Sequence, residues 1–234
     1  MLALSREARQ ALDQFQGRLS GQLVVGGSTI PGEYLLPALI GQFKAKYPDI
    51  SISLLIGGSR QVSTWVDDGR AEVGVVGARP TLRTLVSREL MPDELVVVLP
   101  PDHPWAGRKS ITLADLRREP LIVREQGSGS REALEHALGE AQRRSDGAAA
   151  SSARWARPRP SSRRCAPGVG ISIISKRAVD DECKAGAAVV REARRISVSR
   201  AFFYLVTHRD RSRSPLAQAF VDFVESQLPA RASQ

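Results

Sequence analysis

Two short stretches combine the residue types that hold small anions. Residues 26–29 read "GGST" and follow the apolar run "QLVV"; residues 127–130 read "GSGS" and precede the helical pattern "REALEHALGEA". Each stretch supplies backbone N–H groups and hydroxyls where a helix is predicted to begin. The first turn of a helix has unpaired N–H donors and a partial positive charge, so it can hold a carboxylate, a sulfate or a similar anion.

A second interpretation of both stretches is purely structural. Ser and Thr are the usual residues at helix N-termini, where the hydroxyl accepts a hydrogen bond from a backbone N–H of the first turn. If the stretches instead face each other across a cleft, at the C-terminal ends of strands, they form a small-molecule site. Both interpretations remain open from the residues alone.

The sequence contains no recognisable catalytic arrangement. It has no Ser–His–acid order, and "GGSTIPG" lacks the lysine of a phosphate-binding loop and the dinucleotide glycine pattern. Cys165, Cys183 and three scattered histidines have no metal-ligand spacing. We therefore expect no enzyme activity, no cofactor and no metal. His208, beside two arginines, is expected to be ion-paired or solvated.

The first part of the chain alternates strand and helix patterns. Apolar strands are predicted at 21–27, 49–58 and 71–78. A helix opened by Ser28 and Thr29 lies between the first two strands, and a helix capped by Ser59 and ended by Gly69 lies between the second and third. This β-α-β-α-β order predicts a parallel sheet with helices on both faces.

The second part of the chain also contains predicted strands and helices. A strand at 94–99 runs into Pro100, Pro101 and Pro104, a stiff exit that suggests a crossover to a second lobe. A helix begins at the "GSGS" stretch, and a final helix is opened by Ser214-Pro215. The predicted fold is α/β with two lobes after a polar helix. The expected boundaries are a linker helix at 1–19, lobe I at 20–99 with 208–230, and lobe II at 100–207.

Composition places the chain among ordinary globular proteins, with 42% hydrophobic and 25% charged residues over 234 positions. The net charge of +9 is concentrated in one segment, because residues 142–167 hold seven Arg and one Asp and leave only +3 for the rest. The polar start does not match a signal peptide, and no apolar run reaches the roughly 18 residues of a membrane span. We expect a soluble cytoplasmic protein without a membrane partner.

Several segments together resemble the effector-binding domain of LysR-type transcriptional regulators. Their amino-acid sequences are most similar to those of regulators associated with selenium metabolism. The resemblance covers about residues 4–141 and 168–228, and its main segments are "GQLVVGGSTIPGEYLLPALIGQFKAKYPDISISLLIGG", "EVGVVG", "DELVVVLPPDHPW", "REQGSGSRE", "GVGISIISKRAV" and "FFYLVTHRDRSRSPLAQAFVDF".

The resemblance implies a two-lobed fold of the type II periplasmic-binding-protein kind, with each lobe a mostly parallel sheet flanked by helices. It implies that the helix at 4–19 leads back to a DNA-binding helix-turn-helix that this chain lacks, and that the domain forms a dimer or tetramer. A small effector, expected to be an anion, would bind between the lobes. By resemblance, the residues lining its cleft are Ser28, Thr29, Ser59, Ser128, Gly129 and Ser130.

One segment departs from the family pattern. The family has a strand and helix resembling "GSTEAVKQAVRA" before "GVGIS", whereas this chain has "WARPRPSSRRCAP" at 155–167. Codons read one base out of frame across these residues can spell the whole family peptide. We interpret 142–167 as the product of two compensating frame changes and expect it to be loose, since it has no Ile, Leu, Val, Phe or Met. The expected consequence is weak or absent effector binding. The rival interpretation is an arginine-rich nucleic-acid arm.

Two other functions share this fold. A solute-binding protein of a transport system would have the same lobes, but the missing export signal and the linker-like helix argue against it. An enzyme would need an activated nucleophile or an acid–base pair, and the sequence shows neither.

Overall fold

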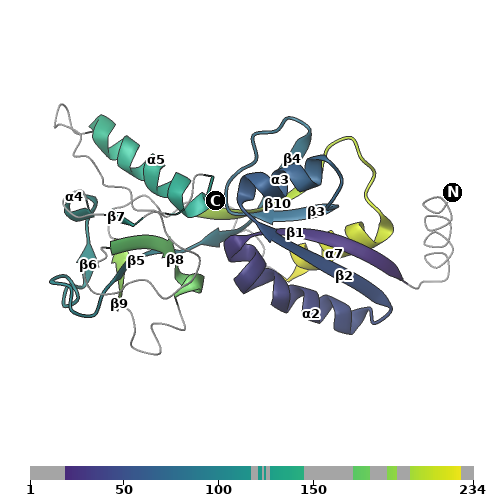
Figure 1. The fold of residues 1–234 in the computed structure, drawn as a ribbon, viewed down its shortest axis with the longest axis horizontal. Coiled ribbons are helices and arrows are strands. Elements are labelled where there is room, and N and C mark those ends of the chain that lie inside the picture. The colour runs from purple at the N-terminus through teal and green to yellow at the C-terminus, as the bar shows by residue number, and fades with distance from the viewer. Residues whose placement is uncertain are drawn as a thin grey trace. The chain divides into compact units, whose positions relative to one another are not determined.

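The computed structural model describes residues 19–116, 121–122, 124, 127–144, 171–179, 189–193 and 201–227. The expectations for the helix at 4–19 and for the segment 142–167 fall almost entirely outside these ranges, as do both cysteines. The chain divides into two compact units: unit 1 is Met1–Met91 with Phe203–Gln234, and unit 2 is Pro92–Phe202. Each unit contains one five-stranded sheet (Figure 1).

Unit 1 has the strand order β2-β1-β3-β10-β4. Strands β1, β2 and β3 run parallel, with Gly21 opposite Ile50 and Gly27 opposite Val75. This confirms the parallel arrangement predicted for the first part of the chain. Strand β10 runs antiparallel to β3, so the sheet as a whole is mixed. The strands are β1 (Gly21–Ser28), β2 (Ile50–Gly57), β3 (Val73–Val76), β4 (Leu85–Asp93) and β10 (Ala201–His208).

Helices cover both faces of this sheet. On one face, α3 (Ser59–Asp67) packs through Val62 and Val66. The other face carries the π-helical turn η1 (Pro31–Leu35) with α2 (Leu36–Lys46), and α7 (Pro215–Ser226). The rings of Phe43 and Phe220 pack α2 against α7, with centroids 5.2 Å apart. The helices predicted between β1 and β2, between β2 and β3 and after Ser214 are therefore confirmed in place, although the first contains a π-helical turn.

Unit 2 has the strand order β6-β9-β5-β8-β7, with β5 antiparallel to both β8 and β9. All five residues of β5 are buried, because one face packs on the cluster with Trp105 and Leu134 and the other on Val179. The elements are β5 (Leu95–Leu99), β6 (Ser110–Ile111), α4 (Leu113–Leu116), β7 (Leu121–Ile122), α5 (Gly129–Arg144), β8 (Ile171–Ser175), η2 (Lys176–Ala178) and β9 (Val189–Ala193).

The chain passes between the units within strands β4 and β10, and not at Pro100, Pro101 and Pro104 as predicted. It leaves unit 1 between Met91 and Pro92 in β4 and returns between Phe202 and Phe203 in β10. The boundaries differ from those expected at 99 and 208 because Leu95–Leu99 pairs on both sides with strands of unit 2. The proline-rich stretch after β5 forms turns within unit 2.

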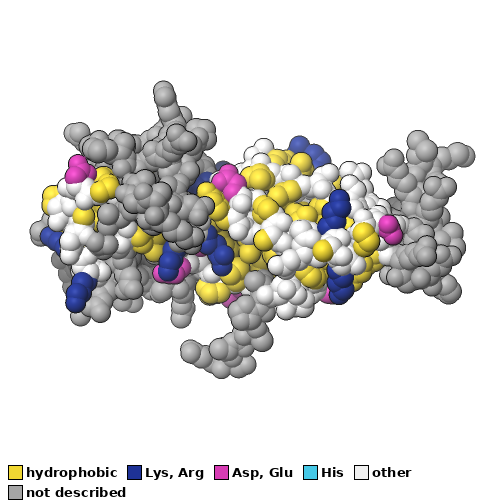
Figure 2. Space-filling model, turned by 90° about the horizontal axis from the view of Figure 1, so that it is seen from below, with side chains coloured by type: hydrophobic (Ala, Val, Ile, Leu, Met, Phe, Trp, Pro, Cys, Tyr) yellow, Lys and Arg dark blue, Asp and Glu magenta, His cyan; other side chains and the backbone are white. Residues whose placement is uncertain are grey.

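Figure 2 shows how charged side chains are distributed on one face of the molecule. On the face drawn in Figure 2, the described Lys and Arg side chains lie apart from one another, with Asp or Glu beside some of them. This dispersal agrees with the small net charge outside residues 142–167. Among the residues described here, no helix has both the length and the apolar character that a bilayer crossing requires.

Candidate functional site

The C-terminal ends of β1, β2 and β3 meet at one edge of the unit 1 sheet, because the three strands are parallel and adjacent. The register pairs Ser28, the last residue of β1, with Gly57, the last residue of β2. The loop that follows β3 begins at Gly77. Loops at the carboxyl ends of parallel strands are the usual location of ligand sites in such sheets.

Ser28 is buried, with 4% of its surface exposed, and its hydroxyl contacts the loop that follows β3. Its Oγ accepts a hydrogen bond from the Gly77 N–H at 3.0 Å. The helical stretch that follows begins at Thr29 and has Pro31 in its first turn, and none of its N–H groups donates to the Ser28 hydroxyl. The structural interpretation, in which this hydroxyl caps its own helix, is therefore wrong for Ser28.

Ser59 behaves in the same way at the start of α3. It is also 4% exposed, and its Oγ accepts a hydrogen bond from the Ala78 N–H at 3.3 Å. The N-cap position belongs to Gly58, whose extended backbone leaves its carbonyl to accept from the Val62 N–H. The prediction that Ser59 caps this helix is wrong, whereas the prediction that Gly69 ends it is confirmed by a left-handed φ of 82°.

The two serines thus bind consecutive backbone N–H groups of one loop, those of Gly77 and Ala78, and both act as hydrogen-bond acceptors. Each hydroxyl oxygen has accepted one backbone N–H, and neither hydroxyl donates to another group within the described ranges. A hydroxyl in this state offers its proton to an incoming acceptor. Thr29, which is half-buried, has a hydroxyl with no partner in the described part of the chain.

Unit 2 holds a second pair of hydroxyls at the start of α5. Ser128 and Ser130 are 5% and 7% exposed, and their Oγ atoms lie 3.1 Å apart. The Ser128 carbonyl accepts from the Glu132 N–H, which places Ser128 at the N-cap position, with half-buried Gly129 next to it. Gly127 has a left-handed φ of 84°, which directs the chain into the helix. The predicted helix start is confirmed.

A buried carboxyl group in unit 2 was missed by the sequence reasoning. Asp93 is 8% exposed, and its Oδ1 accepts a hydrogen bond from the fully buried Ser175 hydroxyl at 2.6 Å. Burial raises the pKa of Asp93 to about 6, although the Ser175 hydrogen bond and the charge of Arg177 oppose that increase. No sequence signal marks Asp93, because its burial depends on strand pairing between β5 and β8.

Metal ligation has no support in the part of the chain that the structure describes. No group of three or more His, Cys, Asp or Glu side chains lies together in those ranges. The polar groups assembled at the strand ends of unit 1 and at the start of α5 are hydroxyls and backbone amides. Such groups are suited to binding and not to redox or acid–base chemistry.

Comparison with solved structures identifies the fold. The regulatory domain of Synechocystis PCC6803 CcmR, in complex with 2-PG, matches with a TM-score of 0.78 at 24% identity, over 91% of this chain and 99% of that chain. The effector-binding domain of QuiR, in complex with shikimate, matches with a TM-score of 0.76 at 20% identity, over 89% of this chain and 97% of that chain. The protein is therefore a two-lobed α/β domain of the type II periplasmic-binding-protein class.

Sequence comparison then gives the family. A model described as the LysR substrate binding domain matches residues 16–229. The HTH-type transcriptional regulator CysL of Bacillus subtilis is 34% identical over 138 residues, which cover 59% of this chain and 46% of that protein. A probable RuBisCO transcriptional regulator of Cyanidium caldarium is 30% identical over 227 residues, which cover 94% of this chain and 70% of that protein.

The chain belongs to the LysR substrate-binding domain family. It spans about half the length of the Bacillus relative and about two thirds of the Cyanidium relative. The resemblance drawn from the sequence segments is confirmed at the level of the family and the fold.

Proposed function

We propose that this domain is the ligand sensor of a LysR-type transcriptional regulator and that a small anion is its effector. The proposed effector ligands are Ser28, Thr29 and Ser59 of lobe I together with Ser128, Gly129 and Ser130 of lobe II. The observation that carries the proposal is the polarity of the lobe I serines. Each of their oxygens accepts one backbone N–H, from Gly77 or Ala78, and each O–H remains able to donate to an acceptor such as a carboxylate or oxyanion.

The regulatory role follows from differential binding. An effector that binds one arrangement of the lobes more tightly than another shifts the population toward that arrangement. In a dimer or tetramer the shift would alter contacts with DNA, made by a helix-turn-helix domain outside these 234 residues. The relatives named above are transcriptional regulators, which favours this role, in the cytoplasm, over transport or catalysis.

The resemblance to selenium-associated regulators narrows the choice of effector. Selenate and selenite are small oxyanions, and their oxygens are the acceptors that the serine protons require. They are therefore the first ligands to test, together with sulfate, phosphate, 2-PG and shikimate. The assignment to selenium oxyanions rests on the amino-acid sequences of the matching segments. Titration with several anions distinguishes a selenium oxyanion effector from another anionic effector.

Calorimetric titration of these ligands tests the proposal. Because we expect residues 142–167 to weaken binding, the titration uses two proteins: the chain itself, and a version in which 155–167 are replaced by "GSTEAVKQAVRA". The expected result is binding of at least one anion by the restored version and weaker binding by the chain itself. Equal binding by both would contradict the expected weakening of binding by residues 142–167, and absence of binding by both would contradict the proposed sensor.

Serine variants of the restored version locate the site. Ser28→Ala and Ser59→Ala are each expected to weaken anion binding about tenfold or more, because each removes one donated hydrogen bond to a charged group. The matched control is Ser63→Ala on the same helix, since Ser63 is also buried but its hydroxyl donates to the Ser59 carbonyl at 2.9 Å. If Ser63→Ala weakens binding as much as Ser59→Ala, the assignment of the donors is wrong.

The nucleotide sequence tests the frame-change hypothesis directly. If two frame changes produced 142–167, the codons for 155–167 spell Gly-Ser-Thr-Glu-Ala-Val-Lys-Gln-Ala-Val-Arg-Ala when read from the third base of the Trp155 codon. Codons that spell an unrelated peptide in that frame would contradict the hypothesis. The arginine-rich segment would then be a genuine insertion, and a nucleic-acid arm would be its leading interpretation.

A further inference from the structure

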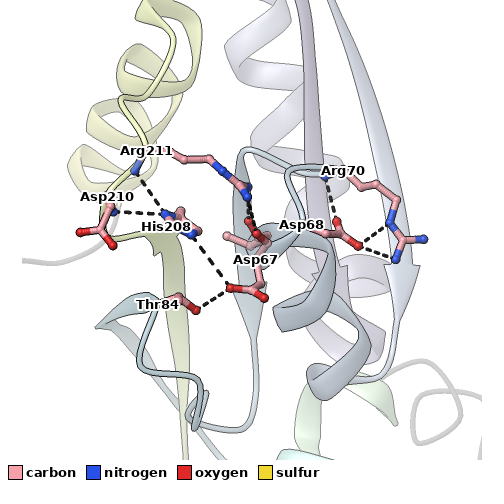
Figure 3. A network of polar contacts seen from close by, with 8 residues as sticks. Asp67, Asp68, Arg70, Thr84, His208, Asp210 and Arg211 are labelled. Atoms are coloured by element: carbon pink, nitrogen blue, oxygen red, sulfur yellow. Dashed lines mark hydrogen bonds and ion pairs between the residues drawn. The ribbon is translucent and has the colours of Figure 1, made fainter.

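A cluster of polar side chains surrounds the C-terminal end of α3, at the opposite end of the helix from Ser59 (Figure 3). Arg211 donates from Nη2 to the Asp67 carbonyl at 2.6 Å and from Nη1 to the Val66 carbonyl at 3.3 Å. Carbonyls in the last turn of a helix have no partner within the helix, and a cation near them is favoured by the helix dipole. Arg211 therefore caps α3 from a distant part of the chain.

The chain leaves space for this guanidinium. Gly69 follows α3 with a left-handed φ of 82°, and a Cβ atom at this position would lie 2.8 Å from Arg211 Nη1. Glycine is thus favoured at position 69 by its backbone angle, and a larger residue there would also displace the end of the Arg211 side chain. The sequence predicts only that Gly69 ends the helix, because Arg211 lies 142 residues farther along the chain.

Two further contacts hold the same end of the helix. The Asp67 carboxylate accepts a hydrogen bond from the Thr84 hydroxyl, and His208 Nε2 lies 4.0 Å from its Oδ1. His208 Nδ1 in turn accepts from the backbone N–H groups of Asp210 and Arg211, at 3.1 and 3.2 Å. These bonds shape the turn that directs Arg211 toward the helix. We call Asp67, Thr84, His208 and Arg211 the α3 clamp.

The clamp connects α3 to the two strands that carry the chain between the units. Thr84 directly precedes β4, and His208 is the last residue of β10. A backbone hydrogen bond from the Arg209 N–H to the Thr84 carbonyl, at 2.7 Å, joins these two segments. At the other end of the nine-residue helix, the Ser59 hydroxyl accepts from the Ala78 N–H.

We propose that Arg211 is a positioning residue, which acts through the α3 clamp to hold α3 where the Ser59 hydroxyl meets the Ala78 amide. A nine-residue helix moves as a rigid rod of about 13 Å, so loss of contacts at one end displaces the other. The Ser59–Ala78 bond, at 3.3 Å, is already long for an N–H···O hydrogen bond and is broken by a small displacement. The relevance of this positioning to ligand binding rests on the proposed function.

Neighbouring amides of one loop provide an internal comparison. The Ala78 N–H is held by Ser59 on α3, whereas the Gly77 N–H is held by Ser28 on β1. Displacement of α3 therefore releases the first amide and leaves the second in place. A loss of stability of the whole unit would release both amides equally, so the pair separates positioning from a general structural effect.

The experiment is residue-resolved amide hydrogen exchange on the full chain and its Arg211→Ala variant. The expected result is exchange about tenfold faster at Ala78 with little change at Gly77, because charge-assisted hydrogen bonds at the helix end are lost. Arg213→Ala is the matched control from the same loop, since Arg213 donates to Gln218 and not to α3. This control is expected to leave both amides unchanged.

Two outcomes would overturn the proposal: equal acceleration at Gly77 and Ala78, or no acceleration at Ala78. Acceleration by Arg213→Ala as large as that by Arg211→Ala would overturn it as well. The measurement needs no ligand, so a failure to find an effector in the titrations leaves it standing. In the same way, an unchanged Ala78 amide would refute the positioning role without affecting the proposed anion sensor.

Discussion

Unit 1 and unit 2 both place buried serine hydroxyls at helix starts, but they hold them differently. In unit 1, Ser28 and Ser59 each accept from a backbone amide of the loop after β3, so the protein determines which way their protons point. In unit 2, Ser128 and Ser130 bond to each other, and either oxygen can be the donor. The first arrangement suits a site of defined polarity, and the second can adapt to a ligand by reversing one hydrogen bond.

The units also differ in buried charge. Unit 2 contains Asp93, whose carboxyl group is hydrogen-bonded to Ser175 and whose pKa is raised by burial. In the described part of unit 1, the carboxyl group with a shifted pKa is that of exposed Asp68, and there the hydrogen bond from the Arg70 side chain lowers the pKa. The comparison predicts that unit 2 is the more sensitive to pH between 4 and 7.

Asp93→Asn gives the largest expected effect. The folded pKa of about 6 exceeds the ordinary value of 3.8, so the folded state binds the proton more tightly and wild-type stability falls as pH rises between these values. Asparagine cannot ionise, so the stability difference between variant and wild type should shift in favour of the variant by about 2 kcal/mol from pH 4 to pH 7.5. Urea unfolding at the two pH values measures this shift.

Asp115→Asn is the control of opposite sign in the same unit. Hydrogen bonds from the Thr112 side chain and N–H, with a further bond from Arg108, hold the pKa of Asp115 below its usual value. Its stabilising effect is lost as the pH falls below 3.8 and is already present at pH 4, so the stability difference between the asparagine variant and wild type should change little from pH 4 to pH 7.5. If both variants show the same pH dependence, the account of Asp93 is wrong.

Gly27→Ala tests how closely the unit 1 site is packed. A Cβ atom on Gly27 would lie 2.7 Å from the Gly32 Cα and 2.8 Å from Leu36 Cδ1, and the backbone of η1 would have to move. We expect a loss of about 2 kcal/mol in the free energy of unfolding, as is typical of overpacking. Gly41→Ala in α2 is the control, because its Cβ meets no atom within 4 Å and should raise stability by about 0.5–1 kcal/mol. Thermal or urea unfolding of the two variants gives the comparison, and a neutral Gly27→Ala would contradict the close packing.

Ser28→Ala and Ser128→Ala test the difference between the hydroxyl pairs most directly, with the smallest expected effects. Loss of the Ser28 hydroxyl leaves the partly buried Gly77 N–H without a partner, which costs about 1–2 kcal/mol. Loss of the Ser128 hydroxyl leaves only the rotatable Ser130 hydroxyl unpaired, which costs about 0.5 kcal/mol. Urea unfolding measures both values. A larger loss for Ser128→Ala than for Ser28→Ala would reverse the comparison.

Local patterns predicted the elements that surround the candidate site. The parallel strands of unit 1 were marked by short apolar runs, and the helix ends at Gly69 and at Ser214-Pro215 by their capping residues. Ser214 does cap α7, since its hydroxyl accepts from the Ala217 N–H. Strands β6, β7 and β9 were missed because two to five residues carry too little periodicity to be recognised alone. The nine-residue β4 was also missed, since most of its residues are polar or exposed.

The sequence alone was sufficient for the α/β alternation, the helix ends and the presence of hydroxyl-rich helix starts, because these depend on residues close together in the chain. Only the tertiary structure decided what the hydroxyls do. Ser59 accepts from an amide 19 residues away, and Arg211 caps a helix more than 140 residues before it. Such pairings depend on which strands become neighbours in the sheet. The secondary-structure propensities of individual residues do not determine that arrangement.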